Sequence, residues 1–121
     1  MEAERRKYRR VAFKARTSYS VISQEQKGAS EESTTMNVCP SGVMFPASHH
    51  IAPHTLLDIE LFLPPGSFFH TSAVTVKAIG EVRWVKRVND TERYNLGIQF
   101  RQIKDEDRER IASYIYGRNQ S

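Results

Sequence analysis

Alternation of apolar and polar residues with a period of two is the feature that most constrains the fold of this chain. In YNLGIQF, residues 94–100, every second residue from Tyr94 to Phe100 is apolar, and LLDIELFL, residues 56–63, repeats the pattern. Successive side chains of a β-strand point to opposite faces, so this periodicity is typical of strands buried on one face. The sequence therefore predicts a fold dominated by antiparallel strands.

Further segments extend or interrupt this pattern. Residues 11–21 are apolar mainly at odd positions, which predicts another half-buried strand. Residues 23–35 are polar and predict a long loop or ragged hairpin with its turn at Gly28. In the next long segment the apolar phase shifts near Gly80, which predicts a β-bulge or bend there. Trp84 continues the phase that follows the shift and is expected in the core.

The C-terminal region changes to a helical pattern. Residues 105–116 begin with acidic side chains, which a helix N-terminus favours, and Gly117 stands where such a helix would end. Ile111, Tyr114 and Ile115 form one narrow apolar stripe. The whole pattern predicts an all-β dominated fold, a small six-stranded antiparallel β-barrel with this C-terminal α-helix packed over an opening or an edge.

Size and charge limit the organisation of the chain. With 121 residues, we expect one domain, made of a flexible basic arm at 1–10, the barrel with its helix at 11–117, and a short tail at 118–121. The single cysteine excludes an internal disulfide, and no apolar run approaches the length that crosses a bilayer. We therefore expect a cytoplasmic protein with no membrane span. The net charge is +4, and the basic residues gathered near the N-terminus should attract anions.

Two short motifs carry most of the functional information. The arm contains R-x-x-x-R twice, in overlapping registers within ERRKYRRV, and NVCPSGVMF contains N-x-C-x-x-G. The residues of the two motifs are Arg5, Arg6, Arg9, Arg10, Asn37, Cys39 and Gly42. In their order, and with LLDIELFLP, GEVRWV, YNLGIQF and RERIASYI further along, they resemble the PilZ family over nearly the whole chain. The signature of that family is an R-x-x-x-R arm followed later by [D/N]-x-S-x-x-G.

The resemblance implies a split barrel that binds cyclic di-GMP, a bacterial second messenger, on its outer surface. It implies that Arg6 and Arg10 form the motif pair, because Val11 follows directly as the start of the first strand. It also implies that Arg5, just before the motif, favours an intercalated dimer of the ligand. Arginine suits this ligand because its planar guanidinium grips the O6 and N7 acceptors of guanine, stacks on purines and pairs with phosphate.

By the same resemblance, Asn37 reads a guanine edge, and Gly42 permits close approach of backbone and ligand. Cys39 stands where the family has serine, and a thiol is a weaker hydrogen-bonding group than a hydroxyl. We expect ligand binding to be either abolished or weakened, by roughly fivefold for one lost neutral hydrogen bond. Secondary ligand candidates are Arg9, Arg83 and Trp84.

The sequence contains no phosphate-binding loop of the P-loop type and no recognisable Ser-His-Asp or Cys-His constellation, so we predict a binding module and not an enzyme. The implied role is an effector that changes conformation on binding cyclic di-GMP. It would signal to a separate, unidentified protein target, in motility, polysaccharide export or transcription. Whether the protein is a monomer or a homodimer stays open.

A degenerate PilZ adaptor that has lost the nucleotide and acts only by protein contact is the main alternative, and Cys39 is its best support. A barrel that uses its arm on RNA or single-stranded DNA is a weaker one. Such proteins expose aromatic residues for base stacking, whereas the aromatic residues here mostly follow the inward phase. A metal site at His49, His50 and His54 is not expected, because Pro53 interrupts the spacing and no cysteine lies near.

Overall fold

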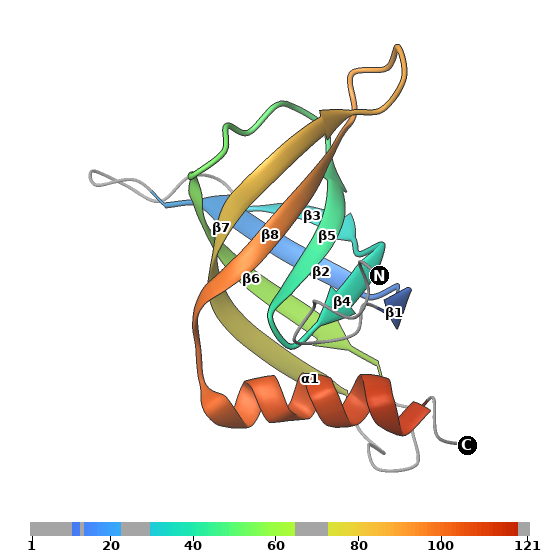
Figure 1. Ribbon diagram of the computed structural model, residues 1–121, viewed down its shortest axis with the longest axis vertical. Coiled ribbons are helices and arrows are strands. Elements are labelled where there is room, and N and C mark those ends of the chain that lie inside the picture. The colour runs from blue at the N-terminus through green and yellow to red at the C-terminus, as the bar shows by residue number, and fades with distance from the viewer. Residues whose placement is uncertain (1–10, 13, 23–29, 65–72, 119–121) are drawn as a thin grey trace, which may run out of the picture.

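The computed structural model describes residues 11–12, 14–22, 30–64 and 73–118, which form eight strands and one helix (Figure 1). In chain order the strands are β1 (Val11–Ala12), β2 (Arg16–Val21), β3 (Glu31–Thr34), β4 (Asn37–Cys39), β5 (Gly42–Ala47), β6 (Leu56–Leu63), β7 (Val74–Arg87) and β8 (Tyr94–Ile103). The helix α1 (Asp105–Arg118) follows β8 closely. All ladders are antiparallel, and the strand order in space is β1-β4-β5-β8-β7-β6-β2-β3.

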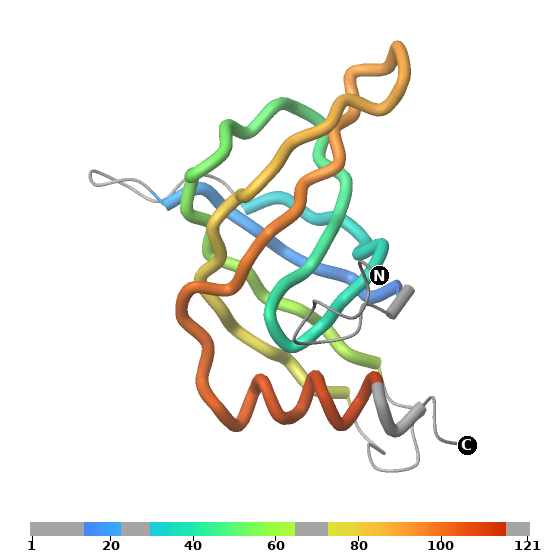
Figure 2. Tube along the Cα trace, in the orientation of Figure 1, coloured from blue at the N-terminus to red at the C-terminus, as the bar shows by residue number. Residues whose placement is uncertain are grey.

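The two ends of this sheet belong to the same pair of bent strands. Residues 13–15 separate β1 from β2, and residues 35–36 separate β3 from β4. β1 and β2 behave as one interrupted strand, and β3 and β4 behave as a second one, because β1 pairs with β4 and β2 pairs with β3. Counted in this way the eight strands become six, and their ladders connect in a ring whose curled path Figure 2 follows. The predicted six-stranded antiparallel barrel is confirmed.

A buried threonine lies at the interruption. The backbone N–H of Ala15 donates to Thr35 Oγ1 at 2.8 Å, and the backbone N–H of Thr35 donates to the carbonyl oxygen of Ala15 at 2.8 Å. These two bonds replace the ladder where the strands bend. The predicted strand at 11–21 is therefore broken in two, although its alternation persists, since Ala15, Thr17 and Tyr19 are all buried.

The polar stretch at 23–35 was expected to be a loop or ragged hairpin, and part of it proves to be a strand. Glu31–Thr34 forms β3 and pairs with β2 through the backbone. Gly28, the expected turn, lies outside the described residues. A strand whose side chains are polar on both faces carries no apolar period, so the sequence pattern gave no signal for it.

Inward-facing side chains of the barrel form one apolar core. Along β6 every second residue is buried, with Leu57, Ile59 and Leu61 fully covered. The rings of Tyr19 and Phe45 pack with their centroids 4.8 Å apart. The apolar positions that recur with a period of two thus form the inward face of the barrel.

The helix α1 lies across one end of the barrel (Figure 1). Its predicted stripe, Ile111, Tyr114 and Ile115, is at most 1% exposed, and the Tyr114 hydroxyl donates to the carbonyl oxygen of Pro64 beyond β6. The stripe therefore covers its own barrel. Among the residues that the structure describes, no helix has the length and apolar character needed to cross a membrane.

The strand β7 is irregular where the sequence predicted it to be. Its register with β8 shifts between Ile79 and Gly80, which confirms the irregularity expected near Gly80. A second shift follows between Val82 and Trp84. Val82 is fully buried, whereas Trp84 is only half-buried and pairs with Gly97. The prediction that Trp84 lies in the core was wrong, because the second shift moves it to the outer face.

Candidate functional site

The motif N-x-C-x-x-G forms the tight hairpin between β4 and β5. Cys39 and Gly42 face each other across the turn at Pro40 and Ser41, and Asn37 pairs with Met44 two residues further from the turn. Val38 is fully buried, so alternation places its neighbours Asn37 and Cys39 on the outer face of the barrel. The hairpin therefore presents both motif side chains on the outside.

The first described residues of the chain lie beside this hairpin. In the β1–β4 ladder Val11 pairs with Val38, and Ala12 pairs with Asn37. Arg10 directly precedes Val11 in the sequence. The four arginines of the arm, at positions 5, 6, 9 and 10, lie outside the described residues, so their predicted contacts stay predictions.

An outer row of four paired residues crosses the barrel wall from the hairpin. Asn37 on β4 pairs with Met44 on β5, Met44 pairs with Gly97 on β8, and Gly97 pairs with Trp84 on β7. Directly paired residues in an antiparallel sheet share one face. The inner neighbours Phe45 and Leu96 are fully buried, so this row faces outward. It brings two predicted residues, Asn37 and Trp84, onto one surface.

Gly97 makes room for the indole of Trp84. A Cβ atom at Gly97 would lie 2.1 Å from both Nε1 and Cε2 of Trp84, far inside van der Waals contact. The ring therefore lies directly against the backbone of β8, where no other residue type fits without displacing it. Sequence reasoning missed Gly97 and Met44, since only the strand register reveals that they connect Asn37 to Trp84.

Gly42 has a clear structural role. A Cβ atom at this position would lie 2.1 Å from the carbonyl oxygen of Ile98. Next to it, the backbone N–H of Phe100 donates to the carbonyl oxygen of Ser41 at 2.9 Å. Gly42 thus allows β5 to approach β8 closely, a reason for glycine here that is independent of any ligand.

Cys39 is 8% exposed, and its Sγ lies 3.1 Å from the hydroxyl oxygen of Ser41. The thiol is therefore largely covered and already has a hydroxyl neighbour. Ser41 itself is exposed at the tip of the turn. A hydroxyl is thus present within the motif, although two positions beyond the serine of the family pattern.

Arg83, a secondary candidate, belongs to a charged cluster around Glu81. His54 Nδ1 donates to Glu81 Oε2 at 2.8 Å, while Arg101 Nε and Arg83 Nη1 lie 3.4 and 3.8 Å from the carboxylate oxygens. The hydrogen bond from His54, helped by the charges of Arg101 and Arg83, holds the pKa of Glu81 below its usual value against the opposing effect of burial. Arg83 therefore lies beside the outer row but is oriented toward Glu81.

The three histidines considered for a metal site have separate partners. His49 Nε2 lies 3.5 Å from Glu31 Oε2, His50 packs edge-on against Tyr94, and His54 bonds to Glu81. Within the described ranges, no three or more His, Cys, Asp or Glu side chains gather as a metal ion would require.

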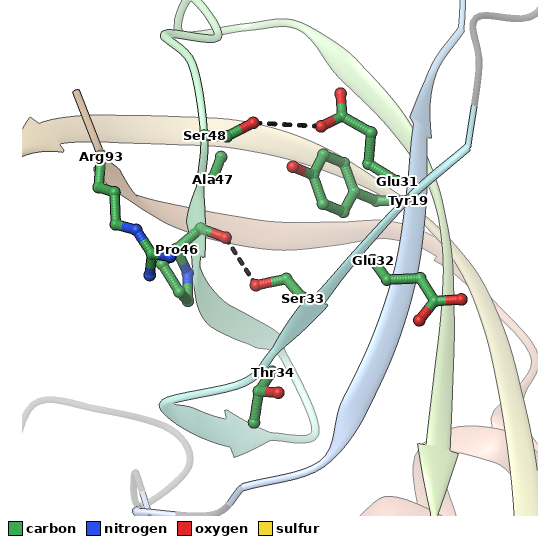
Figure 3. A pocket seen from close by; sticks show the side chains of 9 residues that line it. All are labelled: Tyr19, Glu31, Glu32, Ser33, Thr34, Pro46, Ala47, Ser48 and Arg93. Atoms are coloured by element: carbon green, nitrogen blue, oxygen red, sulfur yellow. Dashed lines mark hydrogen bonds between the residues drawn. The ribbon is translucent and has the colours of Figure 1, made fainter.

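A separate hollow of about 290 Å³ opens between β3 and β5 (Figure 3). It is lined by Tyr19, Glu31, Glu32, Ser33, Thr34, Pro46, Ala47, Ser48 and Arg93. Ser33 Oγ donates to the carbonyl oxygen of Pro46 at 2.6 Å, and Ser48 Oγ donates to Glu31 at 3.4 Å. Burial, and secondly the charge of Glu31, raises the pKa of Tyr19 to about 12. With two carboxylates against one arginine, this hollow does not suit a dianionic ligand.

The PilZ domain family model matches residues 4–117, so the chain belongs to the PilZ domain family. PilZ domains are receptor or adaptor domains. A comparison with curated protein sequences gives no match.

Three solved structures illustrate the similarity of fold. The Bacillus subtilis inhibitor of motility, MotI/DgrA, gives a TM-score of 0.76 at 14% identity, over 96% of this chain and 51% of its own, so this chain spans about half of MotI. The PilZ domain of YcgR from Escherichia coli, solved with cyclic di-GMP, gives a TM-score of 0.65 at 10% identity, over 96% of this chain and 92% of its own. The PilZ domain of CeSA from a cellulose-synthesizing bacterium gives a TM-score of 0.56 at 7% identity, over 91% of this chain and 97% of its own.

Proposed function

We propose that this PilZ domain binds cyclic di-GMP on the outer wall of its barrel and passes the change to a separate protein partner in the cytoplasm. The observation that carries the proposal is the β1–β4 ladder, which holds Val11 and Ala12 against Val38 and Asn37. Residues that directly follow the R-x-x-x-R motif are thereby anchored beside the N-x-C-x-x-G hairpin. An arm that starts there can reach a ligand lying on the hairpin.

The chemistry of the two segments suits a cyclic dinucleotide. Arg6 and Arg10 supply guanidinium groups that pair with phosphate and with guanine O6 and N7, and Asn37 offers an amide to a base edge. Trp84 offers an aromatic face at the far end of the outer row. Two strand spacings of about 4.8 Å separate Asn37 from Gly97, against which the indole lies, and these roughly 10 Å are the room available to the bases of the ligand. Arg5 and Arg9 would add further contacts to the ligand, and Arg5 favours an intercalated pair of ligands.

The alternative is an adaptor that does not bind the nucleotide. The observation in its favour is Cys39, a residue only 8% exposed whose Sγ lies 3.1 Å from Ser41 Oγ. A covered thiol offers a ligand less than an accessible hydroxyl does.

Calorimetric titration with cyclic di-GMP separates the two. We expect saturable binding at micromolar or tighter concentration that is lost in Arg6→Ala and Arg10→Ala. Lys104→Ala, which removes a positive charge next to α1, is the matched control and should bind like the wild type. If the wild type ignores the nucleotide but Cys39→Ser binds it, the adaptor alternative holds.

A further inference from the structure

An open groove of about 490 Å³ lies where β7 and β8 meet the start of α1. It is lined by Asp58, Lys77, Ala78, Ile79, Arg101, Gln102, Ile103, Lys104 and Arg108. Asp58 of β6 pairs with Ile79 of β7, and Ile79 pairs with Gln102 of β8. These three residues therefore lie side by side in the groove. We call it the basic groove, because four of its residues carry positive charge and one carries negative charge.

The cations of the basic groove are available to a partner. Lys77, Arg101 and Lys104 are exposed, and Arg108 is half-buried. Lys77 Nζ lies 3.9 Å from Glu60, a long and solvent-screened contact, and Arg101 shares Glu81 with two other side chains. Exposed ion pairs of this kind contribute little to stability. An incoming carboxylate can therefore compete for these cations.

Arg108 adds an independent indication. Its Nε is buried and has no hydrogen-bond partner among the described residues. A buried donor without an acceptor costs free energy, and native structures rarely leave one. A carboxylate in the groove would bring this guanidinium an acceptor that the described residues do not supply.

One apolar side chain lies among the charged residues of the groove. Ile79, on the outer face of β7, is half-buried, whereas Ala78 and Ile103, which also line the groove, pack with the barrel core. A groove that combines cationic side chains with an apolar contact fits an extended segment carrying both carboxylates and apolar side chains. Its four cations extend from β7 over β8 to α1, so they suit several carboxylates carried on one polypeptide better than one small anion.

We infer that the basic groove docks an acidic segment of a protein partner, with apolar side chains between its carboxylates. The inference rests on the proposed function for the existence of a partner and adds the chemistry of that partner. Single-stranded nucleic acid fits less well, because none of the described residues that line the groove is aromatic and able to stack on bases. None of the outer row lies in the groove, so the two proposed binding surfaces share no described residue.

Peptide display tests the inference without a known partner. A random library of twelve-residue peptides is selected on the wild-type protein. Binders are then compared on the groove variant Lys77→Gln/Lys104→Gln and on the control variant Lys86→Gln/Arg93→Gln. Both variants lose two exposed positive charges, so the total charge is matched. We expect enrichment of peptides with Asp or Glu next to Leu, Ile or Phe. These peptides should bind the groove variant roughly fivefold more weakly than the control variant.

Three outcomes would overturn the inference. The selected peptides could lack acidic residues, they could bind both variants equally, or an oligothymidylate could bind the wild type and lose binding only in the groove variant. The last result would assign the groove to nucleic acid. Titration of cyclic di-GMP into the groove variant keeps the two proposals apart, since nucleotide binding should be unchanged whether or not peptides bind.

Discussion

At the residue scale, Cys39 is the position at which the proposed nucleotide site departs from the serine of the family pattern. Replacement by serine restores a full hydroxyl donor and acceptor at the outer face of the hairpin. We predict that Cys39→Ser binds cyclic di-GMP roughly fivefold more tightly than the wild type, since one neutral hydrogen bond contributes about 1 kcal/mol. Calorimetry measures the affinity, and Cys39→Ala, which shortens the side chain without adding a hydroxyl, should show no gain. An equal gain in Cys39→Ala would indicate relief of crowding by sulfur instead.

Trp84 is the only tryptophan of the chain, so its fluorescence reports on the outer row alone. We predict that cyclic di-GMP quenches or shifts this emission with the same concentration dependence that calorimetry gives, because a purine stacked near the indole changes its surroundings. Gly97→Ala should change the emission before any ligand is added, since its Cβ would displace the ring. Emission that ignores saturating nucleotide would exclude Trp84 from the site.

Glu81 makes stability depend on pH at the acid end. Its folded-state pKa is lowered from 4.5, mainly by the His54 hydrogen bond, so it stabilises the fold above about pH 4.5. That contribution is lost as the pH falls through the lower folded-state value. We predict that Glu81→Gln lowers the free energy of unfolding at pH 7 and that the difference from wild type shrinks as the pH falls below 4.5, measured by urea denaturation. Glu92→Gln, which removes an exposed carboxylate, is the control, and identical curves for both variants would contradict the prediction.

At the scale of elements, α1 closes one end of the barrel with three side chains. Ile111 is fully buried there, so truncation leaves a cavity in the core. We predict that Ile111→Ala lowers the free energy of unfolding by about 3 kcal/mol, measured by urea denaturation. Ser113→Ala, at an exposed position of the same helix, should change it little. A small effect of Ile111→Ala would mean that α1 is only loosely packed on the barrel.

Strands with an apolar period could be predicted from the sequence, and strands without one could not. The segments that became β6 and β8 were identified because one face is buried. The four residues of β3, Glu31–Thr34, are polar on both faces and form a strand only because β2 offers a backbone partner. Trp84 was misplaced for a related reason. A bulge reverses the face on which all later residues of the strand lie, and the position of the bulge depends on the pairing with the neighbouring strand.

At the scale of the whole molecule, the ring of strands brings together residues that the sequence separates. The motif residues Asn37, Cys39 and Gly42 could be named from their spacing and order alone. Their continuation through Met44 and Gly97 to Trp84 could not, because it follows from the register of three ladders. The contact between His54 and Glu81, from two distant segments, was equally beyond a reading of the sequence.

Amide chemical-shift mapping of the full chain with cyclic di-GMP tests the central claim most directly. The account predicts shifts in two segments, the arm at residues 5–10 and the hairpin at residues 37–42, with smaller changes at Trp84. Both segments should respond with one common affinity, because they hold the same ligand. Saturating nucleotide that leaves the arm and the hairpin unchanged, or shifts only residues elsewhere on the barrel, would contradict it.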